Sequence, residues 1–147
     1  QRRVFGLIPG LEHAEFVRYG VMHRNTFLQS PRLLNYDFQM RSKPGLYFAG
    51  QMTGVEGYVE SASSGLTAAL SMARYLAGEA PIDFSAKTAI GALGHYVAEY
   101  NGDDFQPMNV NFGIMDGLDT RIRNKAERYG KIAERALSTL KEICAGL

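Results

Sequence analysis

The chain has 147 residues, a length that fits one domain with a buried core, and its formal net charge of +1 gives no global field for nucleic acid. Any RNA contact must therefore come from a local basic patch. A single cysteine, Cys144, excludes an internal disulfide framework, and the lack of an apolar run of about 18 residues argues against a membrane span.

The first forty residues mix apolar residues with turn residues. Pro9 and Gly10 mark a break in the chain, and a short helix is expected over 11–19. Pro31 blocks regular strand pairing, but residues 33–40 alternate in polarity and predict a strand directly after it.

A strand–turn–helix unit follows. Residues 46–49 are apolar and predict a short strand, and the Ala- and Leu-rich pattern over 58–76 predicts a helix. Between them lie Gly50, Gly54 and Gly57. Glycine lets backbone approach a ligand where a Cβ would clash, and a helix N-terminus presents unpaired N–H groups. The pattern indicates a cofactor-binding turn; an ordinary strand–turn–helix connection is the alternative.

The last third of the chain is predicted to be mainly helical. A helix is expected over 88–99, irregular chain over 105–118, and a long helix over 119–145. The long helix has one apolar face at a spacing of three and four residues. Its members are Ile122, Ala126, Tyr129, Ala133, Ala136, Leu140 and Ile143.

Few residues outside the turn indicate chemistry. His95 and Tyr96 fall on a half-apolar helix face, which favours a structural role for both. Cys144 is expected to be a small hydrophobe of the last helix. The histidines lack metal-ligand spacing and there is no cysteine cluster, so a metal site is not expected. The basic start of the last helix is either a solvated face or a place for nucleic-acid phosphates.

Four stretches resemble the C-terminal part of the folate- and FAD-dependent tRNA (uracil-5-)-methyltransferases, in the same order. The first and most specific is AGQMTGVEGYVESASSG at 49–65. The others are GLIPGLEHAEFVRYGVMHRNTFL at 6–28, TAIGAL at 88–93 with the following His95 and Tyr96, and MNVNFGIMDGLDTRIRNKAERYGKIAERAL at 108–137.

The resemblance implies an α/β fold, the C-terminal part of a FAD-binding Rossmann-like flavoprotein of the glutathione-reductase type with a helical C-terminal region. Residues 1–40 would form a folate-facing loop and strand region, 41–80 the flavin-contacting strand–turn–helix, and 81–147 the helical C-terminal region. The chain has neither an initiator methionine nor the G-x-G-x-x-G turn that holds a pyrophosphate. We therefore expect the FAD-pyrophosphate domain to lie upstream, outside this chain.

The resemblance also implies a reaction. A bacterial cytoplasmic enzyme of this family forms 5-methyluridine in the T-loop of tRNA, with carbon from 5,10-methylenetetrahydrofolate and reducing equivalents from FAD and NAD(P)H. The nucleophilic cysteine is expected upstream, because no residue here matches it. This chain alone is accordingly expected to be catalytically incomplete, and no catalytic residue is assigned within it.

The family's binding residues carry over to two places in this sequence, and charge indicates a third site. His23, Arg24 and Asn25 are implied to face the folate, where an imidazole could stack on the pterin and a guanidinium could meet a carboxylate. The cationic excess over residues 121–131 leaves room for tRNA phosphate contacts, with Arg121, Arg123, Lys125 and Arg128 as the candidates. The implied flavin-binding residues are Gly50, Gln51, Thr53, Gly54, Glu56 and Gly57.

Two alternatives stay open. One is the related FAD- and folate-dependent enzyme that modifies wobble uridines, which has a similar AGQ-x-x-G turn. The continuation VEGYVESASSG and the NVNFG segment favour the methyltransferase. The other is a non-catalytic RNA-binding or assembly module, which would not retain flavin.

Overall fold

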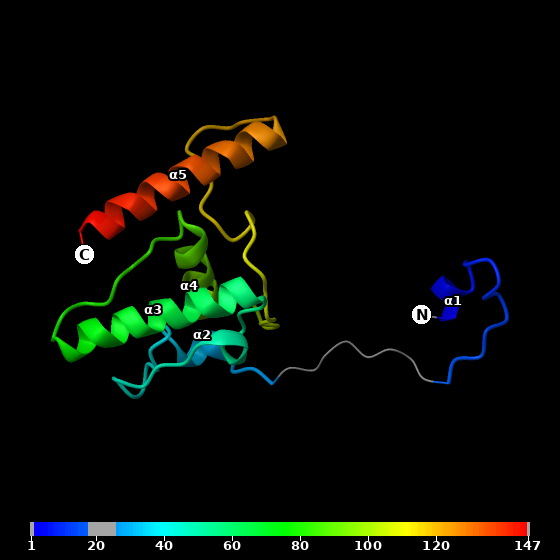
Figure 1. Cartoon of the computed structure of the whole chain (residues 1–147), viewed down its shortest axis with the longest axis horizontal. Coiled ribbons are helices and arrows are strands. Elements are labelled where there is room, and N and C mark those ends of the chain that lie inside the picture. The colour runs from blue at the N-terminus through cyan, green and yellow to red at the C-terminus, as the bar shows by residue number, and fades with distance from the viewer. Residues whose placement is uncertain (1, 18–25, 147) are drawn as a thin grey trace.

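The computed structural model describes residues 2–17 and 26–146. Helices account for its regular structure, and Figure 1 shows α1 apart from the other helices, beyond the residues that are not described. The elements in chain order are α1 (Arg2–Phe5), α2 (Ser30–Leu33), the 3-10 helix η1 (Gly50–Thr53), α3 (Tyr58–Leu76), α4 (Ala89–Glu99) and α5 (Lys125–Ala145).

The two predicted strands are wrong for the described part of the chain. Pro31 lies at the start of α2, where its missing N–H is harmless, so Leu33 ends a helix. The following residues form only isolated antiparallel bridges, Leu34 to Met40 and Gln39 to Tyr47. A strand is stabilised by a continuous ladder of neighbours, and these segments have single bridges instead. The helix predicted over 11–19 is also wrong, since residues 11–17 form turns and irregular chain.

The three predicted longer helices are present. α3 has the predicted bounds, and α4 begins after Thr88, whose hydroxyl oxygen accepts the Gly91 N–H at 3.0 Å. α5 begins at Lys125, later than predicted, because the Asn124 side chain caps it by accepting the Glu127 N–H at 3.1 Å.

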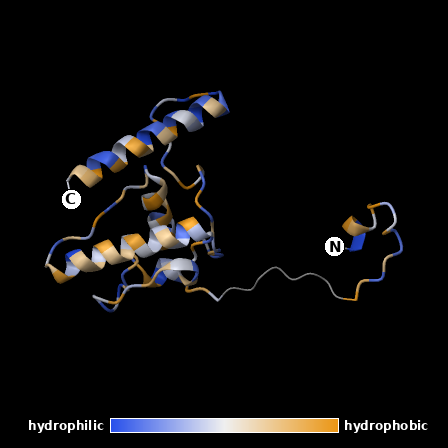
Figure 2. Ribbon diagram, in the orientation of Figure 1, coloured by the Kyte–Doolittle hydropathy of each residue, from blue (hydrophilic) through white to orange (hydrophobic). Residues whose placement is uncertain are grey.

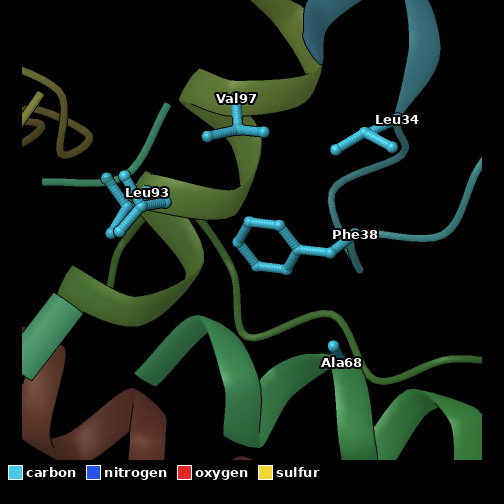
Figure 3. Packing of buried hydrophobic residues seen from close by; sticks show 6 residues of the cluster. Leu34, Phe38, Ala68, Leu93 and Val97 are labelled. Atoms are coloured by element: carbon cyan, nitrogen blue, oxygen red, sulfur yellow. The ribbon is translucent and has the colours of Figure 1, made fainter. Parts of the chain in front are cut away.

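The core lies where α3, α4 and the turn after α2 meet (Figure 3). Leu34, Phe38 and Val97 are almost fully buried, and Ala68 of α3 and Leu93 of α4 close the cluster. α4 approaches this turn closely, because a Cβ at Gly94 would lie 2.4 Å from the Tyr36 carbonyl oxygen. The core therefore packs α3, which belongs to the predicted flavin-contacting unit, against the following helix α4.

α5 lies above α3 and α4 in the view of Figure 1, and its buried face agrees only in part with the predicted one. Ile132 is its one described buried residue, at 4% exposure, whereas Ala126 and Ala133 of the predicted face are exposed. Figure 2 shows hydrophilic and hydrophobic residues alternating along this helix. Arg135 ties α5 to the preceding loop by donating to the carbonyl oxygens of Asp116, at 2.6 Å, and Gly117.

No helix within the described ranges is long and apolar enough to cross a membrane.

Candidate functional site

The predicted flavin-binding turn folds as a 3-10 helix between two left-handed glycines. Ala49 is extended, Gly50 turns the chain at φ +72°, and η1 ends at Gly54 with φ +88°. Gly57, at φ +98°, then caps the N-terminus of α3. Left-handed backbone strains any residue with a Cβ, so all three positions require glycine on local grounds.

Two of these glycines also have other side chains of the protein packed beside them. A Cβ at Gly54 would lie 2.4 Å from Cζ of Phe105. A Cβ at Gly57 would lie 2.1 Å from Oε2 of Glu60 and 2.8 Å from Nδ2 of Asn109. The space beside these glycines is thus filled by protein atoms, a reason that differs from the ligand approach expected from the sequence.

Hydrogen bonds inside the turn occupy some of the groups expected to face the flavin. The Gly50 N–H donates to Oγ of Ser64 at 2.8 Å, and the Ser64 hydroxyl donates to the Ser61 carbonyl oxygen at 2.8 Å. Thr53 is fully buried, and its hydroxyl donates to the Gly50 carbonyl oxygen at 2.8 Å. Gly50 and Thr53 therefore shape the turn through internal bonds.

The solvent-facing side of the turn offers different groups. Gln51 and Met52 are exposed, and Glu56 is half-buried. α3 starts without a side-chain cap, because Gly57 has no side chain, so the first N–H groups of this helix are open to an outside acceptor. One face of α3 is also smooth at Gly65, where a Cβ would meet nothing within 4 Å. This combination can receive a flat or anionic ligand.

A segment fifty residues downstream completes the turn. The Glu56 N–H donates to the Met108 carbonyl oxygen and the Met108 N–H to the Gly54 carbonyl oxygen, both at 3.0 Å. Asn109 adds a bond from Nδ2 to the Glu56 carbonyl oxygen at 3.1 Å. Sequence reasoning did not pair these residues; the only signal was that both segments lie in stretches resembling one family.

The predicted folate-facing residues His23, Arg24 and Asn25 lie outside the described residues. The described chain resumes at Thr26, and the Leu28 N–H donates to the Met52 carbonyl oxygen of η1 at 2.8 Å. The segment that follows the predicted folate loop is thus attached to the predicted flavin turn.

The four predicted tRNA-contacting residues gather at the start of α5. Arg121 and Arg123 are exposed in the preceding loop, and Lys125 begins the helix. Lys125 Nζ and Arg128 Cζ lie 5.5 and 5.3 Å from the ring centroid of Tyr129. That ring stacks on Phe112 at 4.2 Å between centroids, an aromatic neighbour that the sequence did not reveal.

His95 has three neighbours in the structure. Its Nε2 lies 3.0 Å from Oδ1 of Asp83, its Nδ1 lies 2.9 Å from Oε1 of Glu99, and its ring stacks on Tyr36. Burial lowers the pKa of His95, but the hydrogen bonds to the two carboxylates outweigh burial and leave this pKa above its ordinary value of 6.5. These contacts join α4 to the loop before it, as a structural histidine would.

Within the described ranges, no group of three or more His, Cys, Asp or Glu side chains is arranged to hold a metal ion. Cys144 is a free, exposed thiol near the end of α5.

Comparison with known proteins shows the family to which the chain is similar. A family model described as Glucose inhibited division protein A matches residues 1–80. Proteins named methylenetetrahydrofolate–tRNA-(uracil-5-)-methyltransferase TrmFO are similar over almost the whole chain. One from Streptococcus gordonii is 62% identical over 95% of this chain and 32% of its own length. One from Listeria monocytogenes is 55% identical over 100% of this chain and 34% of its own length. A third, from Bacillus licheniformis, is 56% identical over 97% of this chain and 33% of its own length. The family resemblance predicted from the sequence is confirmed, and the chain spans about a third of the length of these relatives.

Proposed function

The chain belongs to the glucose inhibited division protein A family, and on that premise we propose that it is part of a folate- and FAD-dependent tRNA (uracil-5-)-methyltransferase. The observation that carries the proposal is 55–62% identity, over almost all of this chain, to relatives whose name states that activity. The product would be 5-methyluridine in the T-loop of tRNA, formed with carbon from 5,10-methylenetetrahydrofolate in the cytoplasm.

The turn from Gly50 to Gly57 is the proposed flavin-facing element. Bound FAD, recharged by NAD(P)H, would supply the reducing equivalents of the reaction. Gln51 is exposed and can reach a ring edge, while the uncapped N–H groups of α3 can stabilise negative charge on a bound ring. Thr53 and Gly54 would act by holding the turn in shape, because both are buried in it. Glu56 is half-buried beside them and is proposed to complete the site.

The folate is proposed to lie on the side of the turn that Met52 and Leu28 share. His23, Arg24 and Asn25 precede Leu28 by only a few residues, and the Leu28–Met52 hydrogen bond of 2.8 Å fixes that end of the segment to η1. An imidazole and a guanidinium suit the aromatic ring and the carboxylates of a folate.

Other parts of the reaction are assigned outside this chain. We propose that a Rossmann-like domain elsewhere in the protein binds the FAD pyrophosphate and that a cysteine there attacks the uracil. The exposed Cys144 is an unsuitable nucleophile, since it lies near the end of α5 and outside the turn. The basic residues Arg121, Arg123, Lys125 and Arg128 are proposed to bind tRNA phosphates.

A chimera tests the proposed reaction. This chain would replace the matching third of the Streptococcus gordonii relative, and the purified chimera would be incubated with unmodified tRNA, FAD, NADPH and methylenetetrahydrofolate labelled in the methylene carbon. Label in 5-methyluridine supports the proposal. Label at a wobble uridine instead, or in no nucleoside while the unaltered relative is active, contradicts it.

Two glutamine variants of the chimera test the flavin-facing turn. Gln51→Ala is expected to lower the bound flavin absorbance and the rate of 5-methyluridine formation, because it removes the exposed polar side chain of η1. Gln29→Ala, an exposed glutamine outside the turn, is the matched control and should change neither. Equal flavin content in the two variants would show that Gln51 is not part of the flavin site.

A further inference from the structure

A cavity that is separate from the predicted flavin turn lies between the C-terminal half of α3 and the turn that follows α2. Its volume is about 310 Å³, within the range of small-ligand pockets. Residues from four segments line it, among them Asp37, Ser71, Glu79 and the tyrosines Tyr36, Tyr47 and Tyr75. None of these residues belongs to the predicted flavin, folate or tRNA sites.

The carboxylate of Asp37 is buried in this wall without a counter-ion. Asp37 is 3% exposed, and Oδ1 accepts the Gln39 N–H at 3.2 Å. Within the described ranges, no Lys, Arg or His nitrogen lies within ion-pair distance of it. A buried carboxylate without a cation is costly, since low-dielectric surroundings disfavour its charge. Burial accordingly raises the pKa of Asp37 above its ordinary value, although the backbone hydrogen bonds lower it in part.

A second polar group in the same wall is also unsatisfied. Ser71 is fully buried, and its Oγ has no hydrogen-bond partner. One turn earlier on α3, Thr67 donates its hydroxyl to the Ser63 carbonyl oxygen at 3.1 Å, which is the usual way to satisfy a hydroxyl in a helix. Buried hydroxyls without a partner are rare, so an unfilled acceptor or donor position points to a missing polar ligand.

The cationic side chain closest in sequence to the cavity is bound elsewhere. Arg74 donates to Oε2 of Glu79 at 3.1 Å and to the Ala80 carbonyl oxygen at 2.6 Å. This ion pair offsets the charge of Glu79, whereas Asp37 has no ion-pair partner within the described ranges. Three tyrosines, Tyr36, Tyr47 and Tyr75, also line the cavity, and aromatic rings suit the alkyl and ammonium parts of an organic cation.

We propose that this cavity binds an organic ammonium group, with the Asp37 carboxylate as its counter-ion, Ser71 Oγ as a hydrogen-bond acceptor and the tyrosine rings around its carbon chain. The ammonium could belong to a free amine or to a lysine side chain of another polypeptide segment. Both offer the same chemistry to the cavity. The proposal is independent of the methyltransferase assignment.

Titration of the 147-residue chain with n-butylammonium chloride tests the proposal, followed by amide chemical shifts in the NMR spectrum. Saturable shifts at Tyr36 and Gln39 are expected, and n-butanol, with the same carbon chain but no charge, should bind at least about tenfold more weakly. Equal binding of n-butanol would overturn the proposal, because the cavity would then be merely apolar.

Charge-matched variants sharpen the test. Asp37→Asn keeps an oxygen for the Gln39 N–H and should weaken n-butylammonium binding by about tenfold or more, whereas Asp103→Asn, on an exposed turn, should leave it unchanged. Ser71→Ala should weaken it by about threefold. If Asp37→Asn binds n-butylammonium with wild-type affinity, the proposal is overturned. If Asp37→Asn is unfolded, Ser71→Ala takes its place, and wild-type affinity of Ser71→Ala for n-butylammonium then overturns the proposal.

A lysine analogue separates the two sources of the ammonium. If Nα-acetyl-lysine N-methylamide binds as well as n-butylammonium, the cavity is built for a lysine side chain. If only the small amine binds, the cavity takes a free amine. Either result supports the ammonium site. If neither n-butylammonium nor the lysine analogue binds, the proposal is overturned.

Discussion

At the scale of single residues, the glycines of the turn differ in what surrounds them. Gly54 has a left-handed φ of +88° and Phe105 against the place of its absent Cβ, whereas Gly65 lies in α3 with open space there. The same chemical change therefore has opposite consequences at the two positions.

Gly54→Ala is expected to lower the free energy of unfolding by about 2–4 kcal/mol, the sum of backbone strain and overpacking. The matched variant Gly65→Ala is expected to raise it by up to about 1 kcal/mol, since alanine favours a helix more than glycine does. Urea unfolding followed by circular dichroism measures both. Equal effects would show that Phe105 moves aside at no cost.

His95 predicts a pH-dependent contribution to stability. Its folded-state pKa is above the ordinary 6.5, so folding favours the protonated form. The contribution is fully present below about pH 6.5 and is lost as pH rises through the folded-state pKa. It should stay under about 1 kcal/mol, because the partner side chains of Asp83 and Glu99 are 50% and 62% exposed.

The measurement compares His95→Gln with the wild type at about pH 5.5 and about pH 8.5. The variant should be less stable at the lower pH, with the difference shrinking at the higher one. His13→Gln, at an exposed histidine of the N-terminal segment, is the control. A difference that grows with pH would contradict the charged interaction with the carboxylates.

At the scale of secondary-structure elements, the three long helices were predictable, whereas the short helix over 11–19 and the two strands were predicted wrongly. The Ala- and Leu-rich pattern is a local signal and predicted α3 correctly, but the prediction did not use the cap at Asn124 and therefore began α5 too early. Residues 33–40 alternate like a strand, but a strand also depends on partners elsewhere, and here the chain makes only single bridges.

The buried face of α5 was predictable only in part. Tyr129, Ala136, Leu140 and Ile143 are half-buried as the periodicity predicts, but the centre of the face is Ile132, which that pattern left out. Small residues such as Ala133 carry a weak signal, because alanine is common on exposed helix surfaces as well.

Two truncations on α5 check this face. Ile132→Ala should lower the free energy of unfolding by about 2–3 kcal/mol, because Ile132 is 4% exposed and its removal leaves a cavity. Leu137→Ala should cost less than about 1 kcal/mol, since Leu137 is 62% exposed. Urea unfolding gives both values. A larger loss in Leu137→Ala would place the buried face of α5 elsewhere.

At the scale of the whole molecule, the candidate site joins segments that are far apart in sequence. Gly50, Gln51 and Gly57 were predicted to share one turn because their motif is local. Ser64, Phe105 and Met108 were not assigned to the turn, because their role depends on tertiary contacts with it. The cavity at Asp37 was missed for the same reason: its lining comes from segments with no shared motif.

The basic region before and within α5 leads to a prediction about salt. In the chimera, the double variant Lys125→Ala/Arg128→Ala should weaken tRNA binding and lower the slope of log affinity against log salt concentration by about 2, or about 1 per phosphate contact. Lys141→Ala, on an exposed position of the same helix, should leave the slope unchanged. Equal slopes in all three proteins would show that tRNA binds elsewhere.

The pairing of Gly54 and Glu56 with Met108 makes the occupancy of the turn and the opening of the 105–109 segment one coupled equilibrium. A ligand that binds only the closed turn lowers the opening probability of Met108 by the factor 1 + [L]/Kd. Reciprocally, a change that loosens residues 105–109 reduces the apparent affinity at η1 without touching the ligand. Amide exchange at Met108 therefore reports the loading of a site to which that residue contributes no side chain.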